Sequence, residues 1–133
     1  MTREEILRGV RVCLARVVDR DTESIREGDK IIDDLGADSL DLLDLIFQLE
    51  QHFGIRIKTR DLERRAQAEL GETPLEIDGV YTEPALERLR SSMSEVPASE
   101  LAAGLRTAEL PYRFRVATFA NLVERLVQEQ GRE

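Results

Sequence analysis

The stretch Asp34-Leu35-Gly36-Ala37-Asp38-Ser39-Leu40-Asp41 determines how this chain is interpreted, because it places one serine at the first turn of a strongly patterned helix. Asp38 or Ser39 is a suitable N-cap, and the helix is expected to run to about Phe53 and to end at Gly54. Carboxylates stand on both sides of the serine. A serine in such a place is better suited to be modified by another enzyme than to attack a substrate.

Apolar residues in this helix form two stripes when successive residues are placed about 100° apart. The first stripe is expected to face the core, and the second lies well round the helix, bracketed by Asp44 and Glu50. Burial of the helix on two sides explains the second stripe. An exposed apolar strip among acids, which marks a docking face, explains it too. The first stripe consists of Leu42, Leu45, Ile46, Leu49 and Phe53, and the second of Leu40, Leu43 and Phe47.

Ser39 lacks the partners that a catalytic serine needs. A hydrolytic serine requires a base to take its proton and usually an acid to orient that base. The single histidine of the chain, His52, lies on the same predicted helix, roughly 20 Å away at 1.5 Å per residue. It cannot reach Ser39 along a continuous helix, so the sequence argues against serine hydrolysis.

Metal and phosphate-loop chemistry are also unsupported. Five aspartates lie near the serine, but no twelve-residue calcium loop ending in glutamate is present. The chain has no glycine-rich phosphate loop and no cysteine–histidine cluster, so no metal site is expected. Its one cysteine, Cys13, falls in a helical apolar pattern and is expected to be buried, which fits a reducing, cytoplasmic setting. The five aspartates are Asp29, Asp33, Asp34, Asp38 and Asp41.

Composition and charge describe a soluble, helix-prone globular chain of 133 residues, 41% hydrophobic and 35% charged. The formal charge of -8 disfavours nucleic acid and anionic membranes as partners. Residues 1–20 carry a net +2 and residues 21–56 a net -7, so the acidity concentrates around Ser39. Such a patch attracts basic protein surfaces. No apolar run is long enough to span a membrane, and the N-terminal residues do not resemble a signal peptide.

The segments flanking the serine helix also have helical patterns. A capping box formed by Thr2 and Glu5 predicts a first helix over about residues 3–18. The polar loop of residues 19–38 is expected to be held down by four apolar residues, and residues 55–57 form a short extended link. A last helix is predicted with Thr118 as its cap. The loop residues are Ile25, Ile31, Ile32 and Leu35; the inward residues of the last helix are Phe119, Leu122, Val123, Leu126 and Val127.

Residues 58–117 contain caps, breakers and apolar spacing of their own. A helix is predicted from a Thr59 cap to Leu70, stopped by Gly71, followed by a tight turn at Asp78-Gly79. Thr82 opens another helix, which Pro97 is expected to break. This helix has Leu86, Leu89 and Met93 on one side, and a further helical turn is expected at Leu101 and Leu105.

Residues 33–55, with Asp38-Ser39-Leu40 at their centre, resemble the carrier-site region of acyl carrier proteins. The first helix, the anchored loop and residues 118–123 match that family in order and pattern, so the resemblance covers residues 3–60 and 113–130. It implies an all-α fold, an acyl-carrier-like four-helix bundle. The extra residues, about 61–112, are interpreted as a helical insertion within a single carrier domain that spans residues 1–133.

The resemblance implies that a phosphopantetheinyl transferase moves 4′-phosphopantetheine from coenzyme A onto Ser39. The thiol of that arm carries acyl groups as thioesters, and the carrier itself is not an enzyme. Acidic and apolar residues of the serine helix would dock on basic patches of acyl ligases and synthases. The docking residues are Asp38, Leu40, Asp41, Leu43, Asp44, Phe47 and Glu50, and the acyl cleft would be lined by Leu45, Leu49, Phe53 and Ile57.

The leading interpretation is therefore a cytoplasmic, monomeric acyl carrier protein of fatty-acid, polyketide or specialised lipid synthesis. An aminoacyl or peptidyl carrier of a nonribosomal system is a second possibility, and an unmodified acidic interaction module is a third. The insertion would either enclose an unusual acyl chain or present an additional docking surface.

Overall fold

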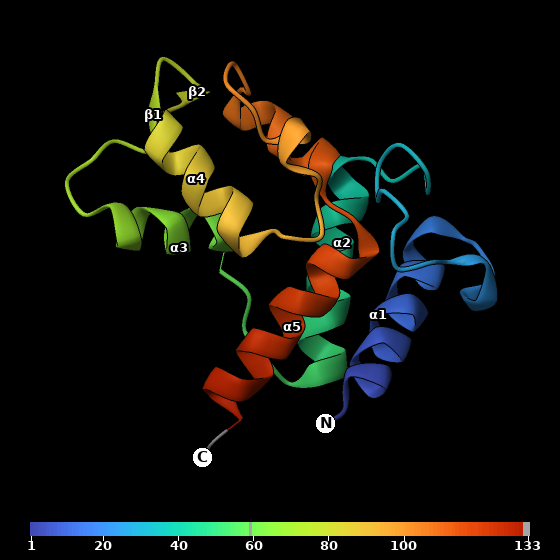
Figure 1. Ribbon diagram of the computed structural model, residues 1–133. Helices are drawn as coiled ribbons and strands as arrows, with labels where there is room; N and C mark the ends of the chain where they lie inside the picture. Colours follow the sequence, from blue (N-terminus) through green and yellow to red (C-terminus); the bar gives the residue numbers. More distant parts are fainter. Residues whose placement is uncertain (59, 132–133) are drawn as a thin grey trace. The chain divides into compact units, whose positions relative to one another are not determined.

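The computed structural model describes residues 1–58 and 60–131, which form two compact units (Figure 1). Unit 1 is built from the described residues of Met1–Ile57 and Phe114–Glu133, and unit 2 from those of Lys58–Arg113. The predicted N-cap Thr59 lies outside the described residues. None of the described helices has the length and apolarity that crossing a lipid bilayer requires.

Unit 1 is helical, as predicted. Its α-helices are α1 (Arg3–Val18), α2 (Ser39–Phe53) and α5 (Val116–Gln130), and a 3₁₀ turn, η1 (Thr22–Ser24), follows α1. α1 packs against both α2 and α5 (Figure 1). Aliphatic side chains from all three helices and from the loop between α1 and α2 make one buried core, so the inward apolar face of each helix is covered.

The capping box at the start of α1 forms as the sequence predicted. The amide of Glu5 donates to Thr2 Oγ1 (3.1 Å), and the amide of Thr2 donates to Glu5 Oε1 (2.8 Å). The hydrogen bond from the Thr2 amide lowers the pKa of the Glu5 carboxyl, and the Thr2 side chain lowers it further. Further along α1, a Cβ at Gly9 would lie 2.4 Å from Phe53 Cζ, so the glycine allows the end of α2 to lie close to α1.

The long loop between α1 and α2 is pinned to the start of α5. The amides of Val116 and Ala117 donate to the carbonyls of Asp29 and Glu27, both at 2.9 Å. The amide of Ile31 donates to the carbonyl of Phe114 (3.0 Å). Of the four predicted anchor residues, three are buried and one is half-buried, so the loop is held firmly. The buried anchors are Ile25, Ile31 and Leu35, and Ile32 is half-buried.

The prediction that Thr118 caps the last helix is wrong. α5 begins at Val116 with Arg115 as its N-cap, and Thr118 Oγ1 accepts a hydrogen bond from the Arg115 amide (2.9 Å). The first amides of the helix, those of Val116 and Ala117, donate to loop carbonyls, so no side-chain cap is needed there. Four of the predicted inward residues are buried and Val127 is half-buried, which confirms the predicted face.

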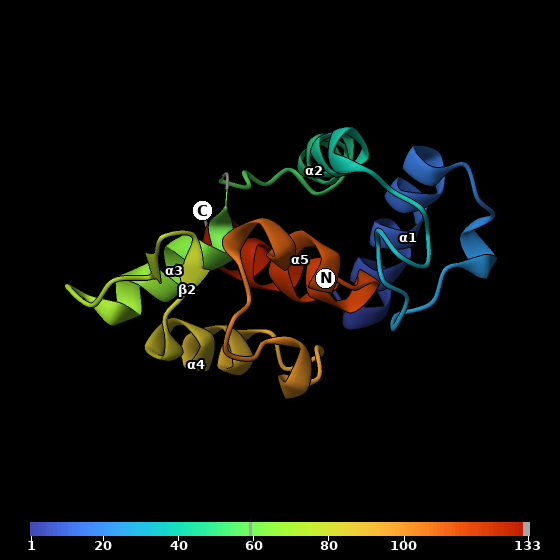
Figure 2. The same ribbon diagram turned by 90° about the horizontal axis from the view of Figure 1, so that it is seen from above.

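Unit 2 contains two helices joined by a hairpin. α3 pairs with α4, as Figure 2 shows from above. The hairpin turns at Asp78 (φ 54°) and Gly79 (φ 81°), and two successive left-handed residues identify a type I′ turn at the position where the sequence predicted a small hairpin or tight turn. The elements are α3 (Asp61–Leu70), β1 (Glu76–Ile77), β2 (Val80–Tyr81), α4 (Glu83–Ser92) and the 3₁₀ segments η2 (Ala98–Glu100) and η3 (Thr107–Arg113).

Several details of unit 2 follow the sequence and two differ. Gly71 ends α3, and Thr82 Oγ1 caps α4 by accepting the amide of Ala85 (3.3 Å). However, α4 already ends at Ser92, so Pro97 does not break it and instead precedes η2. The helical turn expected at Leu101 and Leu105 lies earlier, at η2, and both leucines follow it as buried residues. Arg90 Nε in α4 donates a hydrogen bond to the Leu101 carbonyl (2.8 Å), which holds this segment against α4. Leu86, Leu89 and Met93 form the predicted buried side of α4.

Candidate functional site

Ser39 is the first residue of α2 and is exposed. The helix is capped by the residue before it: Asp38 Oδ1 accepts the amide of Asp41 (2.9 Å), and the Asp38 amide donates to Asp41 Oδ2 (3.1 Å). The sequence left Asp38 and Ser39 as alternative caps, and Asp38 takes the role. The Ser39 hydroxyl is therefore not needed to begin the helix.

The turn that presents Ser39 is firmly held yet open to solvent. Leu35 and Ala37 are each only 4% exposed, and the amide of Ala37 donates to the carbonyl of Ile31 (3.1 Å). Gly36 between them has φ +79°, and a Cβ added there would meet nothing within 4 Å. Ser39, three residues later, is itself exposed, so its side chain is open to solvent.

The start of α2 is also suited to negative charge. Among the hydrogen bonds of the described residues, none uses the amide of Ser39 or of Leu40 as a donor. Free amides and the positive end of the helix dipole together stabilise an anion at this position. These residues thus fit a phosphate ester on the Ser39 oxygen.

The two apolar stripes of α2 have opposite environments. Leu45 and Leu49 are completely buried, and Leu42, Ile46 and Phe53 are half-buried. The second stripe is exposed: Leu40 is 73%, Leu43 66% and Phe47 56% exposed. Burial on two sides is therefore wrong, and α2 presents an apolar strip to solvent. This strip is called the outer stripe below.

The acids near the outer stripe are of two kinds. Asp44 is exposed, whereas Asp38 and Asp41 bond each other's amides in the capping box. Glu50 is half-buried, and its Oε2 accepts the amide of Ile57 (2.8 Å). The sequence did not reveal this internal role of Glu50, because the bond joins the helix to the link that follows it.

The residues predicted to line an acyl cleft lie along the inner side and the end of α2. Leu45 and Leu49 belong to the core of unit 1, and Phe53 and Ile57 are half-buried against it. A reciprocal pair joins this end to α5: the Arg56 amide donates to Gln130 Oε1 (2.8 Å), and Gln130 Nε2 donates to the Arg56 carbonyl (2.9 Å). The four apolar side chains thus lead from the core to the exit of α2.

No catalytic or metal-binding arrangement accompanies Ser39 in the part of the chain that the structure describes. His52 lies in the last turn of α2, at the opposite end from Ser39, with its ring centroid 4.8 Å from that of Phe53. The described residues contain no group of three or more His, Cys, Asp or Glu that could hold a metal ion. Cys13 is buried, and burial raises the pKa of its thiol.

Comparison with known proteins identifies the family. Residues 8–72 match the sequence pattern described as "Phosphopantetheine attachment site". The acyl carrier protein of Thermotoga maritima is 43% identical over 63 residues, covering 47% of this chain and 78% of that protein. The acyl carrier protein of an Exiguobacterium species is 38% identical over 66 residues, covering 50% and 84%.

This chain belongs to the acyl carrier protein family. It is a carrier protein rather than an enzyme, and it holds acyl groups on a covalently attached 4′-phosphopantetheine arm. Such carriers work with transferase and synthase enzymes. No solved structure matches this chain significantly.

The matched region and the two units have different boundaries. The family pattern extends to residue 72 and so includes α3, which belongs to unit 2. In the structure, α3 pairs with α4, and it is α5 that packs against α1 and α2. The third helix within the matched residues is therefore α3, whereas the helix that completes the core of unit 1 is α5.

Proposed function

We propose that Ser39 is the residue to which the phosphopantetheine arm is attached. The single observation that carries this proposal is the exposed hydroxyl at the first residue of α2, left unused because Asp38 caps the helix. On modification, the Ser39 oxygen bonds to the phosphate of the pantetheine half of coenzyme A, the nucleotide half leaves, and the hydroxyl proton is lost. The arm supplies the thiol that holds acyl groups as thioesters.

The residues around Ser39 position its hydroxyl and stabilise the attached phosphate, and they take no part in forming the bond. The unpaired amides at the start of α2 stabilise the negative charge of the phosphate ester. Leu35 and Ala37 hold the turn, so the serine is presented in a fixed position to a phosphopantetheinyl transferase. A flexible arm then raises the local concentration of its cargo at each docked enzyme.

The outer stripe and its acids form the proposed docking face for the transferase and for acyl ligases and synthases. Leu40, Leu43 and Phe47 supply apolar contact area, and Asp44 supplies an exposed charge for basic partner surfaces. Asp38, Asp41 and Glu50 add negative charge to the same face while also making hydrogen bonds within unit 1.

The acyl chain is proposed to enter unit 1 at the exit of α2. Phe53 and Ile57 are half-buried there, and Leu45 and Leu49 continue the apolar path into the core. The Arg56–Gln130 pair stands beside this entrance. An apolar chain is stabilised by leaving water along such a path.

The wider setting completes the proposal. The carrier acts as a cytoplasmic monomer in fatty-acid, polyketide or specialised lipid synthesis. Residues 1–133 are one carrier domain with a core of residues 3–60 and 113–130 and an insertion of about residues 61–112. The packing of α5 against α1 supports this assignment, because α5 lies on the far side of the insertion in sequence. Deletion of residues 61–110 with a short linker tests whether the insertion affects acyl transfer by native partner enzymes; unchanged transfer would argue against a functional insertion.

Intact-mass measurement after incubation with coenzyme A and a promiscuous transferase tests Ser39. The native chain should gain one phosphopantetheine increment, and Ser39→Ala should gain none while keeping its melting temperature, because Asp38 still caps α2. Ser24→Ala, at another exposed serine, is the matched control and should be modified normally. An increment that persists in Ser39→Ala would overturn the assignment, and no increment in the native chain would favour an unmodified interaction module.

The thioester cargo distinguishes an acyl carrier from an aminoacyl or peptidyl carrier. Mass spectrometry of the carrier isolated from its native cells should find an acyl group on the arm. An amino acid or peptide there would identify the nonribosomal alternative instead.

A further inference from the structure

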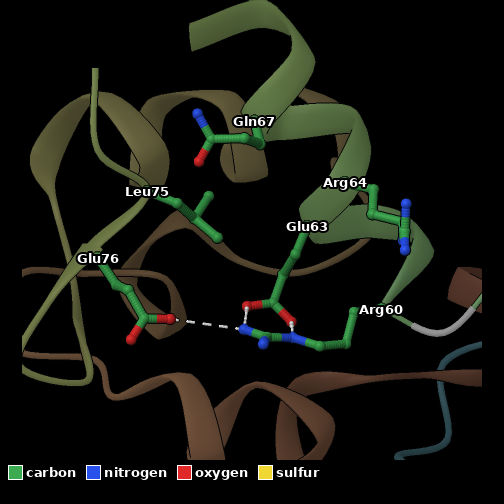
Figure 3. Close-up of a pocket in the computed structure, with 6 residues that line it drawn as sticks. All are labelled: Arg60, Glu63, Arg64, Gln67, Leu75 and Glu76. Carbon is green, nitrogen blue, oxygen red and sulfur yellow. Dashed lines mark hydrogen bonds and ion pairs between the residues drawn. The ribbon is translucent and has the colours of Figure 1, made fainter. Parts of the chain in front are cut away.

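Unit 2 contains a cavity of about 540 Å³ that the carrier function does not use. One side of it is a single face of α3 and its N-cap, with lining residues at the helical spacing i, i+3, i+4 and i+7. The other side is the start of the hairpin. In Figure 3, Arg60 and Glu63 from the first element and Leu75 and Glu76 from the second point toward one another, whereas Arg64 points away from them. The volume lies within the range of small-molecule sites. The lining residues are Arg60, Glu63, Arg64, Gln67, Leu75 and Glu76.

The polar wall of the cavity is fixed before any ligand arrives. Glu63 is buried and accepts three hydrogen bonds: Arg60 Nε (2.7 Å), Arg60 Nη2 (2.6 Å) and the Tyr81 hydroxyl (2.7 Å). The two-point contact sets the plane of the Arg60 guanidinium, and the hydrogen bond to Glu63 raises the pKa of Arg60 further. Arg60 is therefore a permanent cation with a defined orientation.

The opposite wall is held in place as well. Gln67 Nε2 donates to the carbonyls of Gly71 (3.1 Å) and Thr73 (3.2 Å), which fixes the turn that leads to β1. The carbonyl of Leu75 accepts the amide of Thr82 (3.0 Å), so the half-buried Leu75 side chain has a set position. A preformed site avoids the entropy of ordering its walls when a ligand binds.

The hydrogen-bond donors and apolar contacts that the lining residues still offer determine which ligand fits. The Glu63 carboxylate is already hydrogen-bonded to Arg60 and Tyr81. Nη1 of Arg60 has no hydrogen bond among the described residues, so it can donate to a ligand. Glu76 reaches Arg60 at 3.5 Å, longer than a charge-assisted hydrogen bond, and its side chain is 38% exposed, so a ligand oxygen can displace it. Leu75 provides the apolar contact.

We propose that this cavity binds a small monocarboxylate with a short alkyl body, its carboxylate on the Arg60 guanidinium and its alkyl part on Leu75. A planar guanidinium matches a carboxylate. The Glu76 carboxylate in the wall opposes a doubly charged ligand such as a phosphate monoester, and the Leu75 side chain favours a ligand with carbon to bury. The site lies wholly in unit 2, so the inference stands independently of the assignment of Ser39.

Titration of the full chain with hexanoate, followed by amide NMR shifts, tests the site. Hexanoate should shift the signals of residues 60–67 and 75–77. Glu76→Gln should tighten binding about two- to fivefold, because it removes a carboxylate that competes with the ligand. Glu72→Gln removes the same charge from an exposed position outside the lining and should leave the dissociation constant unchanged. Leu75→Ala should weaken binding.

Three outcomes would overturn the inference. The first is binding of hexylammonium in preference to hexanoate, which would assign the site to a cation at Glu76. The second is a weaker complex in Glu76→Gln, or an equal change in Glu76→Gln and Glu72→Gln. The third is a set of shifts confined to unit 1, which would place the alkyl chain in the core of the carrier and leave this cavity without a ligand. None of these outcomes affects the modification of Ser39.

Discussion

Helices α2 and α3 are both rich in acids, but they direct those acids differently. On α3, Asp61 and Glu63 are each only 8% exposed; Asp61 pairs with Arg65, and Glu63 pairs with Arg60 and Tyr81. On α2, Asp44 is exposed beside the outer stripe. The charges of α3 hold unit 2 together, whereas α2 keeps charge and apolar area available to other proteins.

This difference separates residues that stabilise the fold from residues that are free to recognise a partner. Exposed apolar side chains contribute little to folding, and three of them on one helix are consistent with the proposed docking face. Buried, multiply bonded carboxylates contribute to folding and cannot reach a partner without leaving their own donors unpaired. Matched substitutions on the two helices test whether this difference holds.

The largest effect is expected from the two faces of α2 itself. Leu45→Ala should lower the free energy of unfolding by about 2–5 kcal/mol, because it opens a cavity in the core of unit 1. Leu43→Ala, two residues earlier on the outer stripe, should change it by less than about 0.5 kcal/mol. Denaturant titration of both variants measures this. Similar losses would show that the outer stripe is part of the fold.

The next effect contrasts the acids of the two helices. Glu63→Ala should destabilise unit 2 by about 1–3 kcal/mol, since it leaves the buried Tyr81 hydroxyl without its acceptor and Arg60 without its partner. Asp44→Ala should be nearly neutral. Thermal and denaturant unfolding of each variant provide the measurement, and a neutral Glu63→Ala would mean that the carboxylate is not needed for the packing of α3.

Charge reversal separates docking from capping within α2. Asp44→Lys should slow modification by a phosphopantetheinyl transferase roughly tenfold at low salt, without changing stability. Asp41→Lys should also slow it, but with an additional loss of about 1 kcal/mol of stability, because the capping box and a favourable dipole contact are lost. Loading rates at two salt concentrations and melting curves distinguish the two. Rates independent of salt would argue against electrostatic docking.

The smallest effect concerns the alkaline limit of unit 2. Burial first, and the hydrogen bond to Glu63 second, raise the pKa of Tyr81. The folded state therefore holds this proton more tightly than the unfolded chain, whose tyrosine titrates near pH 10. The stabilisation is complete below that pH and falls by about 1.4 kcal/mol per pH unit above it. Unfolding of the native chain and Tyr81→Phe from pH 9 to 11 measures it; equal slopes would contradict the assignment.

The sequence predicted best the features that depend on nearby residues. The bounds of α1 and α2, the Thr2 and Thr82 caps and the Asp78-Gly79 turn are all confirmed. Each depends on side-chain hydrogen bonds or backbone conformations within a few residues. The exposure of the outer stripe needed the structure, because periodicity shows that two faces are apolar without showing which of them is covered.

Features fixed by distant contacts could not be predicted from the sequence. α5 begins two residues before Thr118 because Asp29 and Glu27 accept its first amides from the other end of the chain. The burial of Glu63 depends on Tyr81, eighteen residues later. Its position next to Leu62 and three residues before Ala66 placed it near the inward face of α3, and that spacing was the one signal available.

The hydrogen bonds that join the loop of residues 27–31 to the start of α5 have a consequence for synthesis on the ribosome. Unit 2 is one continuous segment and is complete once residue 113 has emerged. Unit 1 lacks its third helix until residues 116–130 have emerged, so its core closes after unit 2 is complete. Unit 2 can therefore fold before the core of unit 1 closes, and until α5 emerges α1 and α2 lack the helix that completes their shared core.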